Sequence, residues 1–372
     1  MVTESPEKLL FAISSLHGGG AERVISNLAN YYDAAGFQVS IVCLNASKPA
    51  YFLSEGIQVI SLVSSTRRTG LFFRIWYAGL SFSRLRRFLK KERPACAISF
   101  MTSANIWTGL TCLSLNIPYL VSERITPDYT LNRFNPLLKR LSFAVYKRAK
   151  AVVLPSKGMI EGFRKTSPFK KLCNFEVINN PISEFPIPTK EPVYPGRFIL
   201  AAGRLSPQKG FDLLIAAFRR VEEKNVHLLI SGEGEQRALL EEQISALGLS
   251  ERVKLIGFRE NMQDYYRQAE LFVLSSRNEG YPNALLEAMS MGTACIATDC
   301  EYGPSDILES GKNGLLIKTG NIYQMATAIK MVLDDPILKA KLALNAKRIN
   351  ETNSLANTSA KWLELIRRST KI

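Results

Sequence analysis

Histidine is scarce and paired cysteines are absent in this sequence of 372 residues. His17 and His227 are the only histidines, and neither an HExxH motif nor a CxxC pair occurs. The six cysteines are scattered, most of them in apolar stretches: Cys43, Cys96, Cys112, Cys173, Cys295 and Cys300. These shortages argue against a structural or catalytic zinc site. We expect buried, reduced thiols, as in a cytosolic protein.

Motifs that would define a cofactor are also missing. The sequence contains no GxxxxGK[ST] loop, and no GxGxxG turn followed by an acidic residue on the next strand, so a dinucleotide cofactor is not expected. No acidic cluster has the DxD pattern of a metal site. Asp334-Asp335 precedes Pro336 at a predicted helix end, and we interpret this pair as surface. The sequence therefore predicts neither a metal nor a cofactor.

Charge is absent from residues 94–122, a stretch long enough to suggest a transmembrane helix. Serine, threonine and asparagine occur throughout it, however, and Pro118 interrupts it. We predict instead a strand over 95–100, a helix over 104–115 and a strand over 118–122, all in a buried α/β core. Met1–Lys8 is polar and the apolar run after it is short, so no signal peptide is expected.

Positive charge is concentrated in the first half of the chain. The formal net charge is +15; residues 1–185 hold 24 Lys and Arg against 11 Asp and Glu, and residues 186–372 hold 24 against 22. This imbalance indicates that one domain alone meets an anionic surface. Nucleic acid and membrane lipid are both candidates. Lipid is favoured, because no nucleic-acid-binding motif occurs and the basic residues accompany aromatic ones.

The length fits two domains of ordinary size, and strands and helices alternate in each half. The first half opens with a strand, a glycine-rich turn, a helix and a second strand, the pattern of a doubly wound parallel sheet. Five prolines fall in residues 181–196, and the alternation restarts after them. We predict an N-terminal domain over 1–185, a linker over 186–197, a second domain over 198–352, and a C-terminal helical segment over 353–372 that returns to the first domain.

Three glycine-containing turns lie between a predicted strand and a helix. Gly18-Gly19-Gly20 lets the backbone approach a phosphate at a helix N-terminus, although a tight turn alone would also need glycine. The segment 203–210, GRLSPQKG, contains Arg204 and Lys209, whose guanidinium and ammonium suit a diphosphate; solvated surface cations are the alternative. The segment 231–235, SGEGE, also fits a plain strand-to-helix connection.

The segment Glu279–Glu287 is the most informative. Pro282 suits the first helical position, so that Asn283, Ala284 and Leu285 would present free amides. A glutamate inside the following apolar helix costs free energy unless it binds a polar group. We therefore expect the Glu279 carboxylate beside a sugar, the amides beside a phosphate, and the Glu287 carboxylate beside a ribose.

Taken in order, GGGAE, GRLSPQKG, SGEGE, the E-x7-E pair and EYGPSDILESGKNGLLI resemble the retaining GT-B glycosyltransferases of family 4. The resemblance covers nearly the whole chain and is closest to bacterial transferases that extend polyprenyl-diphosphate-linked oligosaccharides for O-antigen, capsule or N-glycan precursors. It implies an α/β fold of two Rossmann-like domains facing across a cleft. It also implies α-retaining transfer of a hexose or N-acetylhexosamine from a UDP-sugar, without a metal ion, at the cytoplasmic face of the cell membrane.

The resemblance implies roles for particular residues. Glu279, Arg204 and Lys209 are the predicted catalytic residues, with the two cations on the donor diphosphate and the carboxylate on donor-sugar hydroxyls. The predicted substrate-binding residues are Gly19, Gly20, Arg124, His17, Gly232, Gly257, Phe258, Arg259, Gly280, Tyr281, Pro282, Asn283, Ala284, Leu285 and Glu287.

One position departs from the family pattern. Many relatives have histidine after the strand that here ends at Ser122-Glu123, and this chain has Arg124. Arginine remains charged at working pH and cannot act as a base, but it can hydrogen-bond a sugar oxygen or a phosphate. His17 could face the acceptor or could simply be exposed to solvent.

A helix is predicted over residues 71–91, with an apolar face for the core and a second face of mixed character. The second face carries Phe73, Trp76, Arg84, Arg87 and Lys91, which suit an anionic membrane surface. A solvated basic face is the alternative. A second basic cluster at 139–150 strengthens the lipid interpretation.

Two other functions remain as alternatives to glycosyl transfer. A nucleotide-sugar 2-epimerase shares the two-domain fold but is expected to carry more acid/base histidines. A catalytically silent, nucleotide-sugar-binding scaffold subunit would not need to keep Glu279, Glu287, Arg204 and Lys209.

Overall fold

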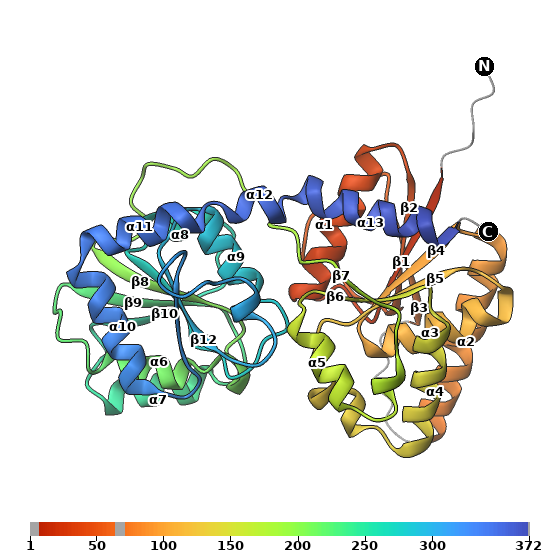
Figure 1. Ribbon diagram of the computed structural model, residues 1–372, viewed down its shortest axis with the longest axis horizontal. Helices are drawn as coiled ribbons and strands as arrows, with labels where there is room; N and C mark the ends of the chain where they lie inside the picture. The colour runs from red at the N-terminus through yellow and green to blue at the C-terminus, as the bar shows by residue number, and fades with distance from the viewer. Residues whose placement is uncertain (1–6, 64–70, 371–372) are drawn as a thin grey trace. The chain divides into compact units, whose positions relative to one another are not determined.

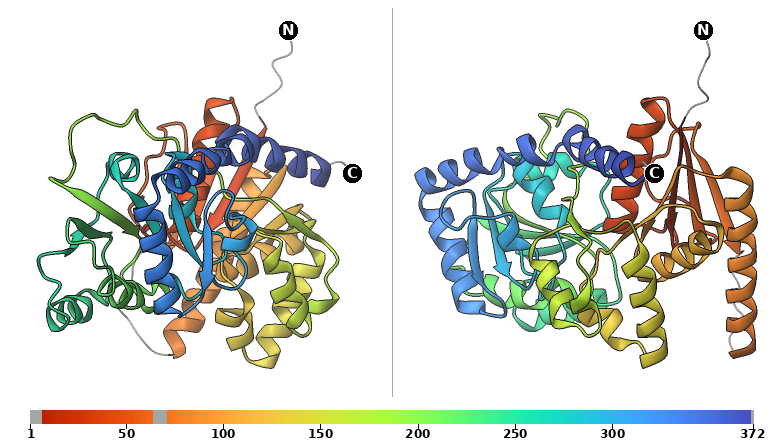
Figure 2. Two further views of the ribbon diagram at one scale, coloured as in Figure 1. Left: turned by 60° about the vertical axis from the view of Figure 1, so that its left-hand side comes forward. Right: turned by 45° about the vertical axis from the view of Figure 1, so that its right-hand side comes forward.

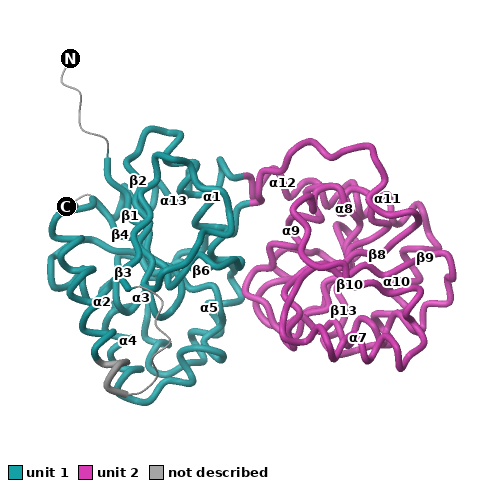
Figure 3. Tube along the Cα trace, turned by 180° about the vertical axis from the view of Figure 1, so that it is seen from behind, with its two compact units in different colours: residues 1–181, 355–372 teal, residues 182–354 magenta. Residues whose placement is uncertain are grey.

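The computed structural model describes residues 7–63 and 71–370, with the side chains of 71–75 excepted. The chain folds into two compact units (Figure 3). Unit 1 consists of residues 1–181 and 355–372, and unit 2 consists of residues 182–354. The boundaries therefore fall at 181/182 and 354/355, whereas the sequence placed domain ends at 185 and 352.

Unit 1 is built on a parallel sheet of seven described strands in the order β3-β2-β1-β4-β5-β6-β7. The central strands are almost wholly buried because helices cover both faces, which is the usual reason for apolar runs in parallel sheets. The strands are β1 (Lys8–Ile13), β2 (Gln38–Asn45), β3 (Gln58–Val63), β4 (Cys96–Phe100), β5 (Tyr119–Ser122), β6 (Ala151–Leu154) and β7 (Phe175–Val177).

The helices of unit 1 are divided between the two faces of this sheet. Helices α1 (Gly20–Ala34) and α13 (Leu355–Thr370) lie side by side on one face, where Trp362 joins the core (Figures 1 and 2). Helices α2 (Leu71–Glu92), α3 (Thr102–Leu115) and α4 (Pro136–Arg148) cover the other face, and α5 (Gly158–Lys165) precedes β7. The described part of the unit also contains three short 3-10 helices: Pro127–Tyr129, Leu131–Arg133 and Phe169–Lys171.

The charge-free stretch is β4, α3 and β5, so its assignment to buried core is confirmed. Among the described residues, no helix is both long and apolar enough to cross a bilayer. Five of the cysteines are buried and Cys173 is exposed, and all six are free thiols.

Unit 2 contains a second parallel sheet, with six described strands in the order β10-β9-β8-β11-β12-β13. Helices α6, α7 and α10 pack on one face and α8 and α9 on the other. The strands are β8 (Arg197–Ala202), β9 (Val226–Ser231), β10 (Val253–Gly257), β11 (Leu271–Leu274), β12 (Cys295–Asp299) and β13 (Leu315–Lys318). The helices are α6 (Phe211–Phe218), α7 (Arg237–Ala246), α8 (Met262–Gln268), α9 (Asn283–Ser290), α10 (Ile322–Asp334), α11 (Pro336–Ala346) and α12 (Ile349–Asn353), with 3-10 turns at Pro207–Lys209 and Pro304–Asp306.

The proline-rich segment 186–197 has no helix before β8, as its composition predicts. It belongs to unit 2, whereas the sequence predicts a linker outside both domains. The backbone amide of Thr189 donates to an Asp264 carboxylate oxygen at 2.7 Å, and that of Val193 donates to Gln268 Oε1 at 3.0 Å. Side chains of α8 therefore satisfy backbone groups that proline-rich sequence cannot pair in a sheet.

Candidate functional site

The predicted donor-binding residues of unit 2 gather at the carboxyl edge of its sheet. The loop after β8 carries Lys209 and the loop after β11 carries Glu279, and these two strands are neighbours. From β8 the chain winds toward β9 and β10, whereas from β11 it winds toward β12 and β13. The two loops thus meet at the switch point, where open α/β sheets bind their ligands.

Two glycine-containing loops pack backbone against backbone at this edge. The amide of Leu205 donates to the Glu233 carbonyl at 2.9 Å, and the amide of Gln236 donates to the Leu205 carbonyl at 2.9 Å. Gly232 has a φ of +141°, and a Cβ there would overlap the Gly203 carbonyl oxygen. The glycine in SGEGE is therefore required by contact with the GRLSPQKG loop.

Lys209 and Glu279 form an ion pair in which both side chains are largely buried. Lys209 Nζ lies 2.6 Å from Glu279 Oε1, and the Ser276 hydroxyl donates to the same oxygen at 2.6 Å. An ammonium and a carboxylate are thus held side by side, so that a ligand can present an anionic group to one and hydroxyls to the other.

A second ion pair fixes the loop that carries Lys209. Arg277 contacts the Asp212 carboxylate at 2.6 Å and also donates to the Pro207 carbonyl at 2.8 Å. The Gln208 side chain donates to the Asn278 carbonyl at 3.0 Å. These contacts join the loops after β8 and β11, and thereby hold Lys209 opposite Glu279.

Arg204 has an exposed side chain, and none of the hydrogen bonds or ion pairs among the described residues uses its guanidinium. Phe258 is 62% exposed in the loop after β10, next to the exposed Arg259. The Gly257 carbonyl is already occupied, because it accepts from the amide of Gly232 and from the Ser231 hydroxyl.

The helix that carries Glu287 begins one residue later than predicted. Pro282 is the residue before α9, with extended backbone, and Asn283 is the first helical residue. The amide of Leu285 donates to the Pro282 carbonyl at 3.2 Å, so the prediction of a free Leu285 amide is wrong. The cause is that Pro282 supplies the carbonyl of the first turn instead of entering the helix.

Glu287 is buried in α9, with its carboxylate among hydroxyl groups. Tyr266 donates to Oε2 at 3.0 Å, and Ser183 lies 3.5 Å from Oε1. These hydroxyls reduce the cost of burying a carboxylate in an apolar helix. Tyr281 is also buried, and its hydroxyl accepts from the Asn353 amide at 3.0 Å.

The first glycine loop lies at the carboxyl end of β1 in unit 1. Gly18 has a φ of +100°, where glycine is favoured, and Gly19 is the extended residue before α1. The Gly19 carbonyl accepts the first helical bond from the amide of Arg23. His17 is exposed, and none of the hydrogen bonds or ion pairs found among the described residues uses its ring.

A buried polar cluster surrounds Glu123, at the carboxyl end of β5. Thr102 Oγ1 donates to Glu123 Oε2 at 3.0 Å, and the Asn105 amide donates to Oε1 at 3.0 Å. The Tyr146 hydroxyl also donates to Oε1. Burial raises the pKa of Glu123 to about 7, against the lowering effect of these donors.

Arg124 follows directly and is held by an amide and two rings. Its Nη1 donates to Asn180 Oδ1. Its guanidinium carbon lies 4.8 Å from the Phe100 ring centre and 6.0 Å from that of Trp362. Burial lowers the pKa of Arg124 to about 9, so the side chain keeps its charge at neutral pH.

We predict that Glu123→Gln changes how the stability of unit 1 depends on pH. The pKa of Glu123 in the folded protein, about 7, lies above the ordinary value of 4.5. The contribution of protonated Glu123 to the free energy of unfolding is therefore complete below pH 4.5 and is lost as the pH rises through 7. Because one pKa unit corresponds to about 1.4 kcal/mol, the loss amounts to about 3 kcal/mol. Trp76, Trp107 and Trp362 all lie in unit 1, so tryptophan fluorescence reports the unfolding of that unit. Urea unfolding followed in this way should show the loss of stability in the wild type and not in the variant. If the stabilities of the wild type and the Glu123→Gln variant depend on pH in the same way, the raised pKa of Glu123 is wrong.

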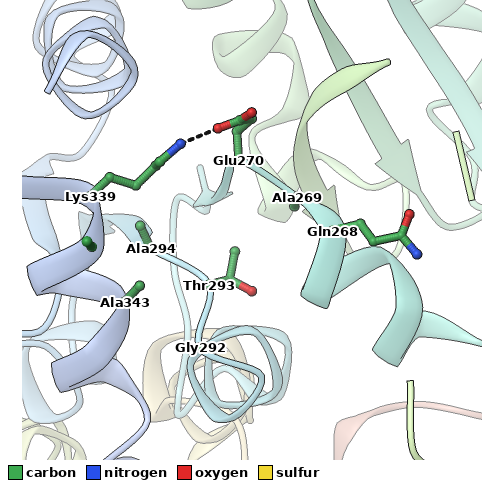
Figure 4. A pocket seen from close by; sticks show the side chains of 9 residues that line it. Gln268, Ala269, Glu270, Gly292, Thr293, Ala294, Lys339 and Ala343 are labelled. Atoms are coloured by element: carbon green, nitrogen blue, oxygen red, sulfur yellow. Dashed lines mark hydrogen bonds and ion pairs between the residues drawn. The ribbon is translucent and has the colours of Figure 1, made fainter. Parts of the chain in front are cut away.

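A separate pocket of about 260 Å³ opens at the amino-terminal ends of β11 and β12 (Figure 4). Lys339 of α11 and Glu270 form an ion pair across its rim, and Ala269, Ala294 and Ala343 lie along it. It therefore lies at the opposite edge of the sheet from Lys209 and Glu279. Within the described residues, no group of three or more His, Cys, Asp or Glu side chains could hold a metal ion.

The structure brings some predicted residues together and leaves others apart. Lys209 and Glu279 touch, whereas Arg204 and Phe258 remain exposed on neighbouring loops. Sequence reasoning missed the partners of the glutamates: Ser276, Tyr266, Ser183, Thr102, Asn105 and Tyr146. Ser276 precedes Glu279 by three residues in a loop, which was the one local signal available.

Two known family models match this sequence. Residues 18–184 match the model described as Glycosyltransferase Family 4, and residues 187–349 match the model described as Glycosyl transferases group 1. Together the two matches extend over most of the chain; the first lies almost wholly in unit 1 and the second lies in unit 2.

Two proteins of Campylobacter jejuni are similar over nearly the whole chain. GalNAc-alpha-(1->4)-GalNAc-alpha-(1->3)-diNAcBac-PP-undecaprenol alpha-1,4-N-acetyl-D-galactosaminyltransferase is 27% identical over 362 residues, covering 96% of this chain and 98% of the relative. N-acetylgalactosamine-N,N'-diacetylbacillosaminyl-diphospho-undecaprenol 4-alpha-N-acetylgalactosaminyltransferase is 29% identical over 351 residues, covering 92% and 94%.

Solved structures with low sequence identity share the fold. HepE (Alr3699) of Anabaena in complex with UDP aligns with a TM-score of 0.77 at 19% identity, over 97% of this chain and 100% of that chain. TarM aligns with a TM-score of 0.78 at 15% identity, over 97% and 98%. With two doubly wound parallel sheets and both family matches, this chain belongs to the group 1 and family 4 glycosyltransferases and has the GT-B fold.

Proposed function

We propose that this glycosyltransferase moves a hexose or N-acetylhexosamine from a UDP-sugar to a polyprenyl-diphosphate-linked oligosaccharide, with retention of the anomeric configuration. The observation that carries the proposal is the Lys209–Glu279 pair at the switch point of unit 2. The names of the two Campylobacter relatives support the acceptor class. UDP bound to a structure of the same fold supports the nucleotide.

Each site residue binds a different group of the donor. Lys209 and Arg204 bind the diphosphate, and Glu279 accepts hydrogen bonds from donor-sugar hydroxyls. Glu287 accepts from the ribose, and the amides of Asn283 and Ala284 at the start of α9 lie toward a phosphate. The exposed ring of Phe258 stacks on the nucleobase. As the bond to the sugar breaks, the two cations stabilise the charge that develops on the departing diphosphate.

The test is to follow release of nucleoside diphosphate and the anomeric configuration of the product. Release from a UDP-sugar only when a polyprenyl-diphosphate-linked glycan is present separates transfer from 2-epimerisation and from a silent scaffold. NMR of the product then reports retention or inversion. A screen of UDP- and GDP-sugars for thermal stabilisation assigns the nucleotide, since a bound donor raises stability by mass action.

We further propose that the transfer needs no metal ion, because Lys209 and Arg204 supply the positive charge. Activity should therefore persist after exhaustive dialysis against EDTA. Loss of turnover on chelation, with recovery on adding Mg²⁺ or Mn²⁺, would show that this assignment is wrong.

The basic face of unit 1 is proposed to lie on the cytoplasmic side of an anionic membrane. In α2, Leu85 and Leu89 are buried, whereas Arg87 and Lys91 are exposed and Trp76 is 52% exposed. Arg84 is exposed too, although it donates to the Leu62 carbonyl at 2.5 Å. The side chain of Phe73 lies outside the described residues. Helix α4 adds exposed apolar residues, Leu137 and Leu141, beside the basic cluster at 139–150.

Replacing Arg84, Arg87 and Lys91 with serine should weaken binding to anionic liposomes at low salt. Each basic residue near such a surface contributes about 1 kcal/mol, and salt screens the attraction. Co-sedimentation over a salt series measures the effect, and Trp76 fluorescence should shift to the blue on binding. The matched control replaces three exposed lysines of unit 2, Lys224, Lys330 and Lys341, with serine. If both triple variants sediment like the wild type at every salt concentration, the membrane proposal fails.

A further inference from the structure

The guanidinium of Arg124 has one edge in use and one edge open. Nη1 donates to Asn180, but Nε and Nη2 are buried without a hydrogen-bond partner among the described residues. Nε and Nη2 are adjacent donors that point in nearly parallel directions. This edge is the fork with which arginine binds two oxygens of one carboxylate or phosphate.

The neighbouring carboxylate does not fill this fork. Glu123 is committed to Thr102, Asn105 and Tyr146, and no ion pair between Glu123 and Arg124 is found in the described part of the chain. Glu123 offsets the charge of Arg124 from nearby but does not satisfy its two N–H groups. A buried donor left unsatisfied destabilises the folded state, and a charged donor does so more strongly.

Two rings and one amide surround the other sides of the guanidinium. The Phe100 and Trp362 rings lie within 6.0 Å of its central carbon, and Asn180 fixes the far edge. The Ser156 hydroxyl is also buried without a partner among the described residues, and it follows β6, the strand beside β5. Both donors therefore lie at the carboxyl edge of the unit 1 sheet, where ligands of doubly wound sheets bind.

We propose that the Nε–Nη2 edge of Arg124 binds an oxyanion carried by the substrate. The oxyanion is either the carboxylate of an acidic sugar or a phosphate oxygen, because both present two oxygens at the spacing of the fork. A neutral hydroxyl presents a single oxygen and no negative charge, whereas an oxyanion presents one charged oxygen to each donor. The side chain is part-exposed, so a small rotation about its flexible dihedral angles opens the fork to the ligand. This inference deepens the proposed glycosyl transfer by assigning an anionic group to the substrate.

The experiment uses the fluorescence of Trp362, which lies beside the guanidinium. In the full chain carrying Trp76→Phe and Trp107→Phe, Trp362 is the only tryptophan. Inorganic pyrophosphate and glucuronate are titrated at constant ionic strength, with glucose as the neutral control. We expect a saturable change with at least one anion and none with glucose. Tighter binding of pyrophosphate assigns the phosphate source, and tighter binding of glucuronate assigns the acidic sugar.

Three variants in this background decide whether Arg124 is responsible. Arg124→Gln should abolish the response, and Arg124→Lys, which keeps the charge but lacks the fork, should weaken it at least tenfold. Arg164→Gln removes an exposed arginine of the same unit and should leave it unchanged. Absence of any saturable response, or an equal response in the Arg124→Lys variant, would overturn the proposal. UDP binding to each variant is measured separately, so that failure at Arg124 is distinguished from failure of the donor site in unit 2.

Discussion

Lys209→Met is expected to lower the affinity for the UDP-sugar by about 30-fold or more. Removing one partner of a desolvated charged contact costs about 2–5 kcal/mol, and about 1.4 kcal/mol corresponds to a factor of ten. The Lys209 side chain is only 20% exposed and lies 2.6 Å from Glu279, so its charge is well shielded from solvent. Isothermal titration of the UDP-sugar, and of inorganic pyrophosphate, measures the loss.

The ion pair complicates this substitution and also supplies its control. Lys209→Met leaves the Glu279 carboxylate, 8% exposed, without its ammonium and should destabilise unit 2 as well. Adding Glu279→Gln removes the unpaired charge and should restore part of the stability without restoring pyrophosphate affinity. Lys318→Met, at an exposed position of unit 2, is the matched control. Unchanged donor affinity in both Lys209→Met and Arg204→Ala would remove the diphosphate assignment.

The buried centre of each sheet could be predicted from the sequence, whereas the two edge strands of the unit 1 sheet could not. Strands such as β1 and β9 are mostly apolar runs, each followed by a glycine-containing turn, which is the pattern of a strand covered on both faces. The edge strand β3 has mostly exposed or half-exposed residues, and β7 has three residues, none of them buried. An edge strand has one neighbour and little apolar surface to bury, so its sequence gives little signal.

The site shows the same division between local and distant information. Glu287 could be selected because a glutamate is unexpected in an apolar helix, and Glu279 because it lies in the loop before that helix, in the E-x7-E pair. The contacts that these glutamates make could not be predicted, since Lys209 lies 70 residues from Glu279 and Tyr266 lies 21 residues from Glu287. Likewise the sequence shows that Arg124 departs from a family pattern, but the surroundings of its open fork depend on Asn180, 56 residues away, and on Trp362 near the C-terminus. The fold alone determines these pairings.

Glu287→Gln is expected to weaken UDP binding by about tenfold or more, through the ribose rather than the diphosphate. A hydrogen bond to a charged group contributes about 1.5–3 kcal/mol, and the amide both loses that charge and offers one acceptor in place of two. Tyr266 can still donate to the glutamine oxygen, so the fold of unit 2 should be retained.

The two donor-site variants should therefore differ in the part of the nucleotide that they bind less tightly. Glu287→Gln should lower the affinity for uridine and leave the affinity for inorganic pyrophosphate unchanged. Lys209→Met should lower the affinity for pyrophosphate and leave that for uridine unchanged. Glu287 is buried on a helix, and Lys209 lies in the loop after β8, so neither substitution alters the other's contacts. Titration of both fragments against both proteins measures the pattern. If Glu287→Gln lowers the affinity for pyrophosphate as much as that for uridine, the Glu287 carboxylate has a structural role in the site and does not bind the ribose.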